Sequence, residues 1–403
     1  MSSVKGSLIN TSRLSIVLVM LALFAFPDKG FLLNFSIPFF VLMMGLLNSS
    51  DIKVTRYLIW GFLYSFITLA SILWASNPDI ALSEGIKVIQ LVVTCYLLSI
   101  WPKGTKDINF VLKAIAISSI ILGARLIFEV PLEAWGARRF GYLLGLNVNT
   151  LAIRLTFGMI ISLYFMSKAT RKTKFLYLMS LAFLTGVILL LGSRRSILIV
   201  IISISLYSIL SSHNILKVVK ASLISVMIGS IIIILTQNVP QLYVIIGNRI
   251  EIMINSFLQG HGMLAESRQV LIGAGIELFK EKPILGWGIG NYRAASGMSL
   301  YSHNNYVEVI ATIGLLGLIT YYSLHFYILL TSVKKIRESK LQALFFTITI
   351  AILMSDYAAP SFSSLFVHVF LAMSMSYLAK RNDSLALAKH AHRDNVETVH
   401  EAL

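Results

Sequence analysis

The sequence has few charged residues, and acidic residues are the scarcer kind. Asp, Glu, Lys and Arg make up 13% of the 403 residues, whereas 57% are hydrophobic and the mean hydropathy is +0.80. This composition excludes a soluble globular domain and predicts an all-α polytopic membrane protein. The net charge of +16 does not indicate nucleic-acid binding, because the basic residues lie in short loops between apolar runs.

Cysteine is nearly absent, and several catalytic motifs are missing. The single cysteine, Cys95, falls within an apolar run, which excludes an intrachain disulfide and a thiolate metal cluster. There is no DxD pair, HExxH, GxSxG or Walker motif, and no cluster of outer carboxylates suited to Mg²⁺ or Mn²⁺. We therefore expect no metal and no cofactor, so any reaction needs a substrate that arrives already activated.

Twelve apolar runs are candidate membrane spans. They cover residues 12–27, 31–48, 57–75, 86–101, 108–128, 147–166, 175–192, 195–212, 219–237, 304–331, 341–357 and 362–379. Lysine-rich segments occupy alternate connections, which predicts cytoplasmic termini by the positive-inside rule. The predicted organisation is nine transmembrane helices in 1–237, a periplasmic loop with short helices over 238–303 that caps the site, three helices in 304–379 and a cytoplasmic tail over 380–403.

The predicted outer side carries arginine rather than lysine. Its arginines are Arg138, Arg139, Arg194, Arg195, Arg249, Arg268 and Arg293, with Arg125 and Arg154 inside spans toward their outer ends. Topology requires positive charge inside and gives no reason for arginine outside. Guanidinium groups match phosphate oxygens bidentately and are less strongly hydrated than ammonium groups. The pattern therefore predicts an outward-facing anion site.

Two of these arginine segments favour a phosphate clamp. Arg194 and Arg195 lie in a connection with almost no loop, where an unpaired charge at headgroup depth costs on the order of 2–3 kcal/mol or more. Snorkelling to lipid phosphates is the alternative. Arg268 lies in the first turn of a predicted amphipathic helix, whose dipole adds to its charge. A salt bridge with Glu266 or Glu277 is the alternative for Arg268.

A glycine-rich turn and a histidine precede the tenth span. Gly286, Gly288 and Gly290 predict tight turns that return the chain to the membrane, since no strand precedes them as in a nucleotide-binding loop. His303 stands at a capped helix start, where a neutral imidazole can take a proton from an acceptor hydroxyl. An interfacial anchor is the alternative.

The residues after His303 are candidates for binding the sugar. Asn304, Asn305 and Tyr306 are interpreted as partners for sugar hydroxyls. Glu308 is close enough in sequence to orient the imidazole or to face the bundle.

Taken in order, these segments resemble the O-antigen ligase and O-antigen polymerase superfamily of integral membrane proteins. The resemblance rests on Arg139-Phe-Gly141, Asn147-Val-Asn149-Thr-Leu-Ala152, LLLGSRRSIL (189–198), Arg268 before PILGWGIGNY, and SHNNYVEVIATIGLLGLI (302–319). The most specific part is His303-Asn304 followed by Gly314 and Gly317. The N-terminal third matches only in hydropathy.

The resemblance implies a GT-C-like glycosyltransferase of the bacterial inner membrane. Such an enzyme transfers a glycan from undecaprenyl pyrophosphate to an acceptor on the periplasmic face, with inversion and without metal; in the ligase, the acceptor is the lipid A–core oligosaccharide. By position, Arg194 and Arg268 hold the pyrophosphate and His303 acts on the acceptor hydroxyl, with Arg195, Arg138 and Arg139 as further substrate contacts. Which of Arg194 and Arg195 faces the ligand stays open.

Two other functions remain as alternatives. The polymerase joins one lipid-linked repeat unit to another and shares the donor chemistry. A transporter of anionic lipid or glycan is a remoter alternative, because the sequence shows neither internal pseudo-symmetry nor helices broken at the midplane.

Overall fold

The computed structural model describes residues 2–47, 53–131, 144–212, 214–248, 251–252, 255, 266–333 and 336–381. Across these ranges all regular secondary structure is helical. Eight segments are long and apolar enough to cross a membrane: Leu8–Ala25, Gly30–Leu47, Arg56–Trp74, Pro78–Ile100, Thr105–Glu129, Val148–Met166, Arg171–Leu190 and Asn305–Val333. The expectation of an all-α, multi-pass membrane protein is confirmed.

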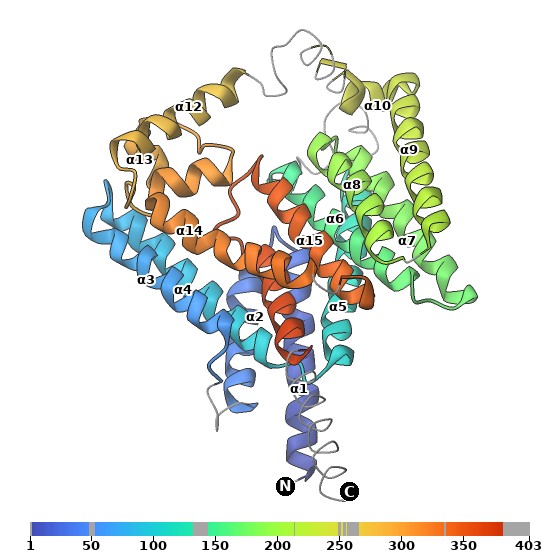
Figure 1. Cartoon of the computed structure of the whole chain (residues 1–403), viewed down its shortest axis with the longest axis horizontal. Coiled ribbons are helices and arrows are strands. Elements are labelled where there is room, and N and C mark those ends of the chain that lie inside the picture. Colours follow the sequence, from blue (N-terminus) through green and yellow to red (C-terminus); the bar gives the residue numbers. More distant parts are fainter. Residues whose placement is uncertain are drawn as a thin grey trace, which may run out of the picture.

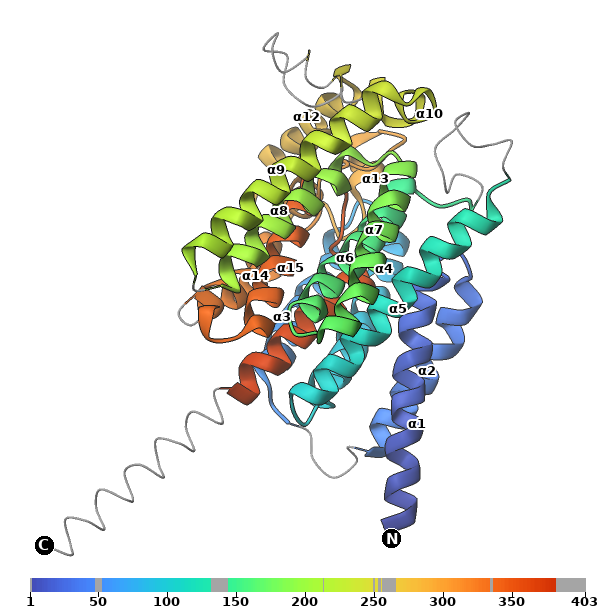
Figure 2. The same ribbon diagram turned by 90° about the vertical axis from the view of Figure 1, so that its right-hand side faces the viewer.

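The eight segments are formed by single helices or by a helix with a short continuation. They are α1 (Ser2–Met20) with the π-helix η1 (Leu21–Ala25), α2 (Gly30–Leu47), α3 (Arg56–Ala70) with the 3₁₀-helix η2 (Ser71–Trp74), α4 (Pro78–Ile100), α5 (Thr105–Glu129), α6 (Val148–Met166), α7 (Arg171–Leu190) and α14 (Asn305–Val333). The buried share of each segment shows which helices lie inside the bundle and which lie at its edge. Of the most apolar window, 83% is buried in α6 but only 17% in α2, so α6 lies inside the bundle and α2 at its edge (Figure 2).

Helices also cover the other four predicted spans. They are α8 (Arg194–Leu210), α9 (Ile215–Asn238), α15 (Lys340–Asp356) and the helix at 365–381. Both α8 and α15 have only 17 residues, which is short for an independent span. The count of twelve spans therefore stays a prediction. The remaining short elements are α10 (Pro240–Leu242), η5 (Tyr243–Gly247), α12 (Glu266–Glu281), α13 (Tyr292–Ser296) and η6 (Ile336–Glu338).

Connections that were predicted to share one side of the membrane lie together. The residues before α3 line one cavity with the end of α4 and with Lys380, and Lys380 also lines a second cavity with the start of α5. Lys340, which begins α15, donates from Nζ to the Ser167 carbonyl after α6 at 2.5 Å. At the other end of the molecule from the start of α1 lie α12 and α13 (Figure 1).

α14 is broken at Gly314, which has φ 66° and ψ −168°. A break frees backbone groups, and in a membrane each of these needs a partner. The turn after α12 supplies them, with four bonds: Trp287 N to Ala311 O (3.1 Å), Gly288 N to Thr312 O (2.7 Å), Leu315 N to Pro283 O (2.9 Å) and Leu316 N to Ile284 O (3.3 Å). The glycine-rich turn therefore fills the gap in the helix.

The break at Gly314 bears on one expectation from the sequence, which shows no helix broken at the midplane and for that reason disfavours a transporter. Gly314 is the tenth of the 29 residues of α14, so the break lies nearer the start of the helix than its middle. Backbone groups on both sides of the break are paired with the 283–288 turn. The expectation about the midplane stays a prediction.

The turn is also attached to the α3–α4 corner. Ser71 Oγ accepts the Ile289 amide at 3.0 Å, and the buried Asn291 side chain accepts the Asn77 amide at 2.7 Å. The Trp74 indole donates to the Leu285 carbonyl at 3.1 Å. Segments about 210 residues apart in sequence thus hold in place the turn that fills the break in α14.

Candidate functional site

His303 has the only positive φ of a non-glycine residue in the described chain, at 55°. A left-handed conformation costs an L-residue about 1–2 kcal/mol, and an outlier of this kind motivates a functional hypothesis. The residues on either side hold His303 in this left-handed conformation. Ser302 donates from its amide to the Glu308 carboxylate at 2.9 Å and from Oγ to the Asn304 carbonyl at 2.7 Å. The imidazole lies against the Tyr301 ring, with centroids 4.1 Å apart.

The imidazole is half-buried, and its pKa lies below the usual value. Burial is the larger cause, and the positive charge of Arg268 is the second. Both effects disfavour the imidazolium form. The ring is therefore neutral over a wider pH range than an ordinary histidine, as a proton acceptor needs to be.

Arg268 and Arg195 bring two guanidinium groups to the same place. Arg268 lies in the first turn of α12, and Arg195 in the first turn of α8. The two charges lie within electrostatic range of each other, although the residues are far apart in sequence. Like charges that approach one another inside a protein are unfavourable unless an anion offsets them, and the Asp356 carboxylate offsets part of the repulsion at Arg195.

Arg195 is partly satisfied by the protein. Its Nη1 donates to the Ser355 carbonyl and its Nη2 to the Asn149 carbonyl, each at 3.1 Å. Its Nε is buried and has no hydrogen-bond partner among the described residues. An orphaned charged donor of this kind costs roughly 1–3 kcal/mol, and a ligand oxygen can remove that cost. Arg195 therefore has one donor, Nε, that no group of the described chain uses.

Tyr301 belongs to the same cluster and was not singled out from the sequence. It lies within electrostatic range of Arg195 and Arg268 and beside the Asn147 side chain. Burial raises the pKa of its hydroxyl, and the two arginines oppose that shift. Only its position two residues before His303 connected it with the site.

The Asn147–Asn149 motif lies directly beside the arginine motif. The Asn147 side chain caps α6 by accepting the Asn149 amide at 2.9 Å. Ser193, the N-cap of α8, donates to the Asn149 side chain at 3.1 Å. These contacts orient the first turn of α8, from which Arg194 and Arg195 extend.

Asn305 is fully buried, and its side-chain amide is fully used inside the protein. It donates to the Tyr322 hydroxyl at 2.8 Å and to Asp356 at 3.2 Å, and it accepts the amides of Ser361 and Phe362 at 2.7 and 3.0 Å. Asp356 also accepts from Tyr322 and Ser361. The network joins α14 to α15 just beyond the Ser355 carbonyl that holds Arg195.

Asn304 and Tyr306 also make internal bonds. The Asn304 side chain accepts the Val307 amide at 3.2 Å, so it caps the start of α14, where the sequence predicts a capped helix. Tyr306 donates to the Leu353 carbonyl at 2.9 Å and stacks on Tyr322. The Glu308 carboxylate accepts the Ser302 amide, so it holds the backbone before His303. The predicted sugar contacts of Asn304, Asn305 and Tyr306 stay predictions.

Of the other predicted site arginines, only Arg194 lies within the described residues. Arg194 begins α8 and is half-buried. Arg138, Arg139 and Arg249 lie outside the described residues. Glu277, one of the two partners weighed for Arg268, pairs instead with Lys280 at 2.7 Å.

Two outer arginines have structural roles. Arg125 binds the Ala25 carbonyl at 2.6 Å and the carboxylates of Asp28 and Glu129. Arg154 donates to the carbonyls of Leu23 and Thr150 and lies over the Phe366 ring at 4.1 Å. Both fix η1 against the bundle, so part of the outer arginine excess is explained by packing.

No group of three or more His, Cys, Asp or Glu side chains suited to a metal ion occurs in the part of the chain that the structure describes. The charge that acts on His303 is instead that of Arg268, which also lies within electrostatic range of Arg195. The expectation of no metal stays an expectation.

A comparison with protein families gives a match to part of the chain. Residues 179–322 match the family model described as O-antigen ligase, and no curated protein matches the chain. The matched segment includes α8, Arg268, the glycine-rich turn, His303 and the break at Gly314. This family indicates glycosyl transfer of the ligase or polymerase type with lipid-linked glycan substrates. The match over residues 179–322 confirms the resemblance of this chain to the O-antigen ligase superfamily.

Proposed function

We propose that the protein is an O-antigen ligase that transfers polysaccharide from undecaprenyl pyrophosphate to the lipid A–core oligosaccharide. The reaction takes place on the periplasmic face of the bacterial inner membrane. One observation carries the proposal: Arg195, Arg268 and the strained His303 converge at one place, although they come from three separate segments.

His303 serves as the proton acceptor in this proposal. The neutral imidazole takes the proton of the acceptor hydroxyl while the hydroxyl oxygen forms a bond to the anomeric carbon. The bond between that carbon and the pyrophosphate oxygen breaks, and undecaprenyl pyrophosphate leaves from the opposite face with inversion. The proton that reaches His303 then passes to solvent or to the departing phosphate.

The arginines stabilise the departing charge. Arg268 and Arg195 bind the pyrophosphate oxygens in this proposal, and Arg194 is a further contact from the first position of α8. Donors fixed in advance toward a developing charge are a large source of catalysis. The carbonyls of Asn149 and Ser355 hold the Arg195 fork, so it needs little rearrangement when the donor binds.

The acceptor distinguishes this proposal from the polymerase, which uses the same donor. The decisive experiment is a lipopolysaccharide gel from a strain that lacks the gene, together with an analysis of its lipid-linked polymer. We expect core without O-antigen, while long polymer accumulates on undecaprenyl pyrophosphate. Core that carries a single repeat unit would instead assign the polymerase and remove the proposed acceptor.

A further inference from the structure

A basic cavity lies at the other end of α14 from His303. It has a volume of about 400 Å³ and is formed by the start of α3, the end of α4, the second half of α14 and the helix at 365–381. Tyr327, which lines it, follows Asn305 by 22 residues, so roughly 30 Å of helix separate the cavity from the proposed active site. The volume is within the range of about 300–1,000 Å³ that is typical of small-molecule sites.

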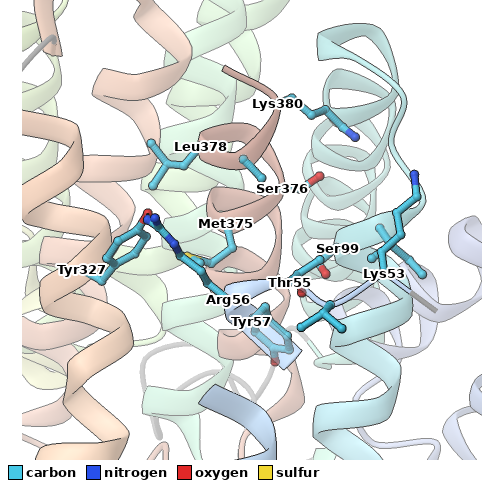
Figure 3. A pocket seen from close by; sticks show the side chains of 13 residues that line it. Lys53, Thr55, Arg56, Tyr57, Ser99, Tyr327, Met375, Ser376, Leu378 and Lys380 are labelled. Atoms are coloured by element: carbon cyan, nitrogen blue, oxygen red, sulfur yellow. The ribbon is translucent and has the colours of Figure 1, made fainter. Parts of the chain in front are cut away.

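Its polar lining is cationic. Lys53, Arg56 and Lys380 line the cavity, and none of the lining residues within the described chain is acidic. In Figure 3, Lys53 and Lys380 stand at one edge, and Arg56 reaches across to Tyr327. The Arg56 guanidinium bonds the Tyr327 hydroxyl and lies over its ring at 5.0 Å. Arg56 is therefore held in place by a neutral partner and keeps its full charge for a ligand.

The cavity wall also contains buried hydroxyl groups with unused hydrogen-bonding capacity. Ser376 Oγ is buried without a hydrogen-bond partner in the described chain. Thr55 Oγ1 accepts the Leu58 amide, so its proton remains available to an acceptor. An orphaned donor beside three cations suits an oxygen-rich anion.

The surroundings favour a lipid over a soluble anion. α3, α4 and α14 are all long and apolar enough to be membrane spans, so the cavity lies at headgroup depth at their ends. Exposed apolar side chains continue from its rim along α3: Ile59, one turn from Arg56, is 52% exposed, and Leu63, one turn further, is 49% exposed. α3 and α14 lie side by side here, as the bond from the Trp60 indole to the Thr320 carbonyl shows. Acyl chains can follow this pair of helices.

We propose that this cavity binds the phosphodiester headgroup of an anionic glycerophospholipid from the leaflet at that end of the helices, which topology predicts to be the cytoplasmic one. The phosphate oxygens accept from Arg56, Lys53 and the Ser376 and Thr55 hydroxyls. Basic pockets between transmembrane helices on the cytoplasmic side suit such headgroups. The bound lipid ties α3 and α14 to the C-terminal helix, independently of the reaction at His303.

Native mass spectrometry of the purified full-length protein with dioleoyl phosphatidylglycerol or dioleoyl phosphatidylcholine tests the site. We expect the phosphatidylglycerol adduct to be preferred. Lys53→Gln and Arg56→Gln should each lower its affinity about five-fold, the factor that one basic side chain near an anionic headgroup contributes. Lys172→Gln, which removes an exposed cation from another connection predicted to be cytoplasmic, is the matched control and should bind as wild type does.

Two further measurements separate a specific lipid site from surface charge attraction and from a soluble anion. Ser376→Val removes a hydroxyl without changing charge, and it should weaken phosphatidylglycerol but not phosphatidylcholine binding. Equal loss in Lys172→Gln, or no preference for phosphatidylglycerol, would overturn the site in favour of general surface attraction. Protection against thermal unfolding by inorganic phosphate at the concentrations at which the lipid protects would show that the ligand is a soluble anion. If Arg56→Gln does not fold, Lys53→Gln and Ser376→Val still decide the question.

Discussion

Single arginines in this protein serve either packing or the candidate site, and their partners separate the two groups. Arg125 and Arg154 are held by carbonyls and carboxylates of the same chain. Arg195 also holds two carbonyls, but its buried Nε has no partner in the described residues, and Arg268 lies near it. The same residue type therefore fixes helices at one place and leaves a donor for an anion at another.

Replacing Arg195 by Lys should remove most of the transfer activity. An ammonium group cannot hold the Ser355 and Asn149 carbonyls and also face a phosphate, because it lacks the planar fork. Loss of transition-state stabilisation by one such donor typically lowers kcat by about 10²–10³. Transfer from a radiolabelled lipid-linked donor by purified protein measures the effect.

Arg293→Lys is the matched control, since Arg293 is exposed in α13. We expect it to leave transfer at the wild-type level. Near-normal transfer by Arg195→Lys together with an inactive Arg194→Lys variant would assign the ligand contact to Arg194 instead.

The pH dependence of transfer should report His303. Burial and the charge of Arg268 lower its pKa, so the neutral form persists at lower pH than in an ordinary histidine. Arg268→Gln removes one of these causes and raises the pKa. The acidic limb of the kcat/KM profile should therefore move to higher pH in this variant, although its activity is low.

Lys280→Gln, at the far end of α12, is the control for this shift and should leave the limb in place. His303→Ala should abolish the limb and slow transfer far more than it weakens donor binding. A limb that survives His303→Ala would show that another group titrates.

At the scale of elements, α14 depends on a second segment to complete it. Gly314 adopts a conformation that is essentially restricted to glycine, and a Cβ there would lie 2.1 Å from the Ile284 carbonyl oxygen. The same close approach makes the four hydrogen bonds of the 283–288 turn possible. The helix and the turn therefore form one unit, with His303 at its start.

Gly314→Ala should destabilise this unit by more than about 3 kcal/mol, since backbone strain of about 1–3 kcal/mol adds to a backbone clash. Gly297→Ala is the matched control. Gly297 also has positive φ, but nothing lies within 4 Å of its added Cβ, so we expect a cost of about 1–2 kcal/mol. Thermal unfolding in detergent compares the two variants. Equal midpoints would contradict the proposed role of the turn.

At the scale of the whole molecule, two functional ends are expected on opposite sides of the membrane. The arginine and histidine cluster belongs to one end, and the basic cavity belongs to the other. If the positive-inside prediction is right, the first end faces the periplasm.

Cysteine labelling of intact cells tests this orientation. In a Cys95→Ala background, a membrane-impermeant thiol reagent should label Leu300→Cys, at an exposed position before His303, but not Lys103→Cys, exposed before α5. After permeabilisation both should react. The opposite pattern in intact cells would place the site in the cytoplasm and remove the proposed donor and acceptor.

The positions of the helices, of the helix cap and of the candidate site residues follow from the sequence alone, because they depend on local chemistry. Hydropathy located the helices because each needs an apolar run of its own. The sequence predicted a capped helix start at 302–305, and Asn304 supplies the cap because its side chain binds an amide three residues away. Arg194, Arg195, Arg268 and His303 stood out because charged groups are rare in such a chain.

Only the tertiary structure decided which distant residues meet. Ile284 fills the break beside Gly314, Asn305 binds Asp356 51 residues away, and Tyr301 joins the two arginines. Such pairs leave no periodic signal, since each partner would be compatible with many others until the helices pack. The orphaned Nε of Arg195 is also a property of packing, because whether a donor is satisfied depends on every group that surrounds it.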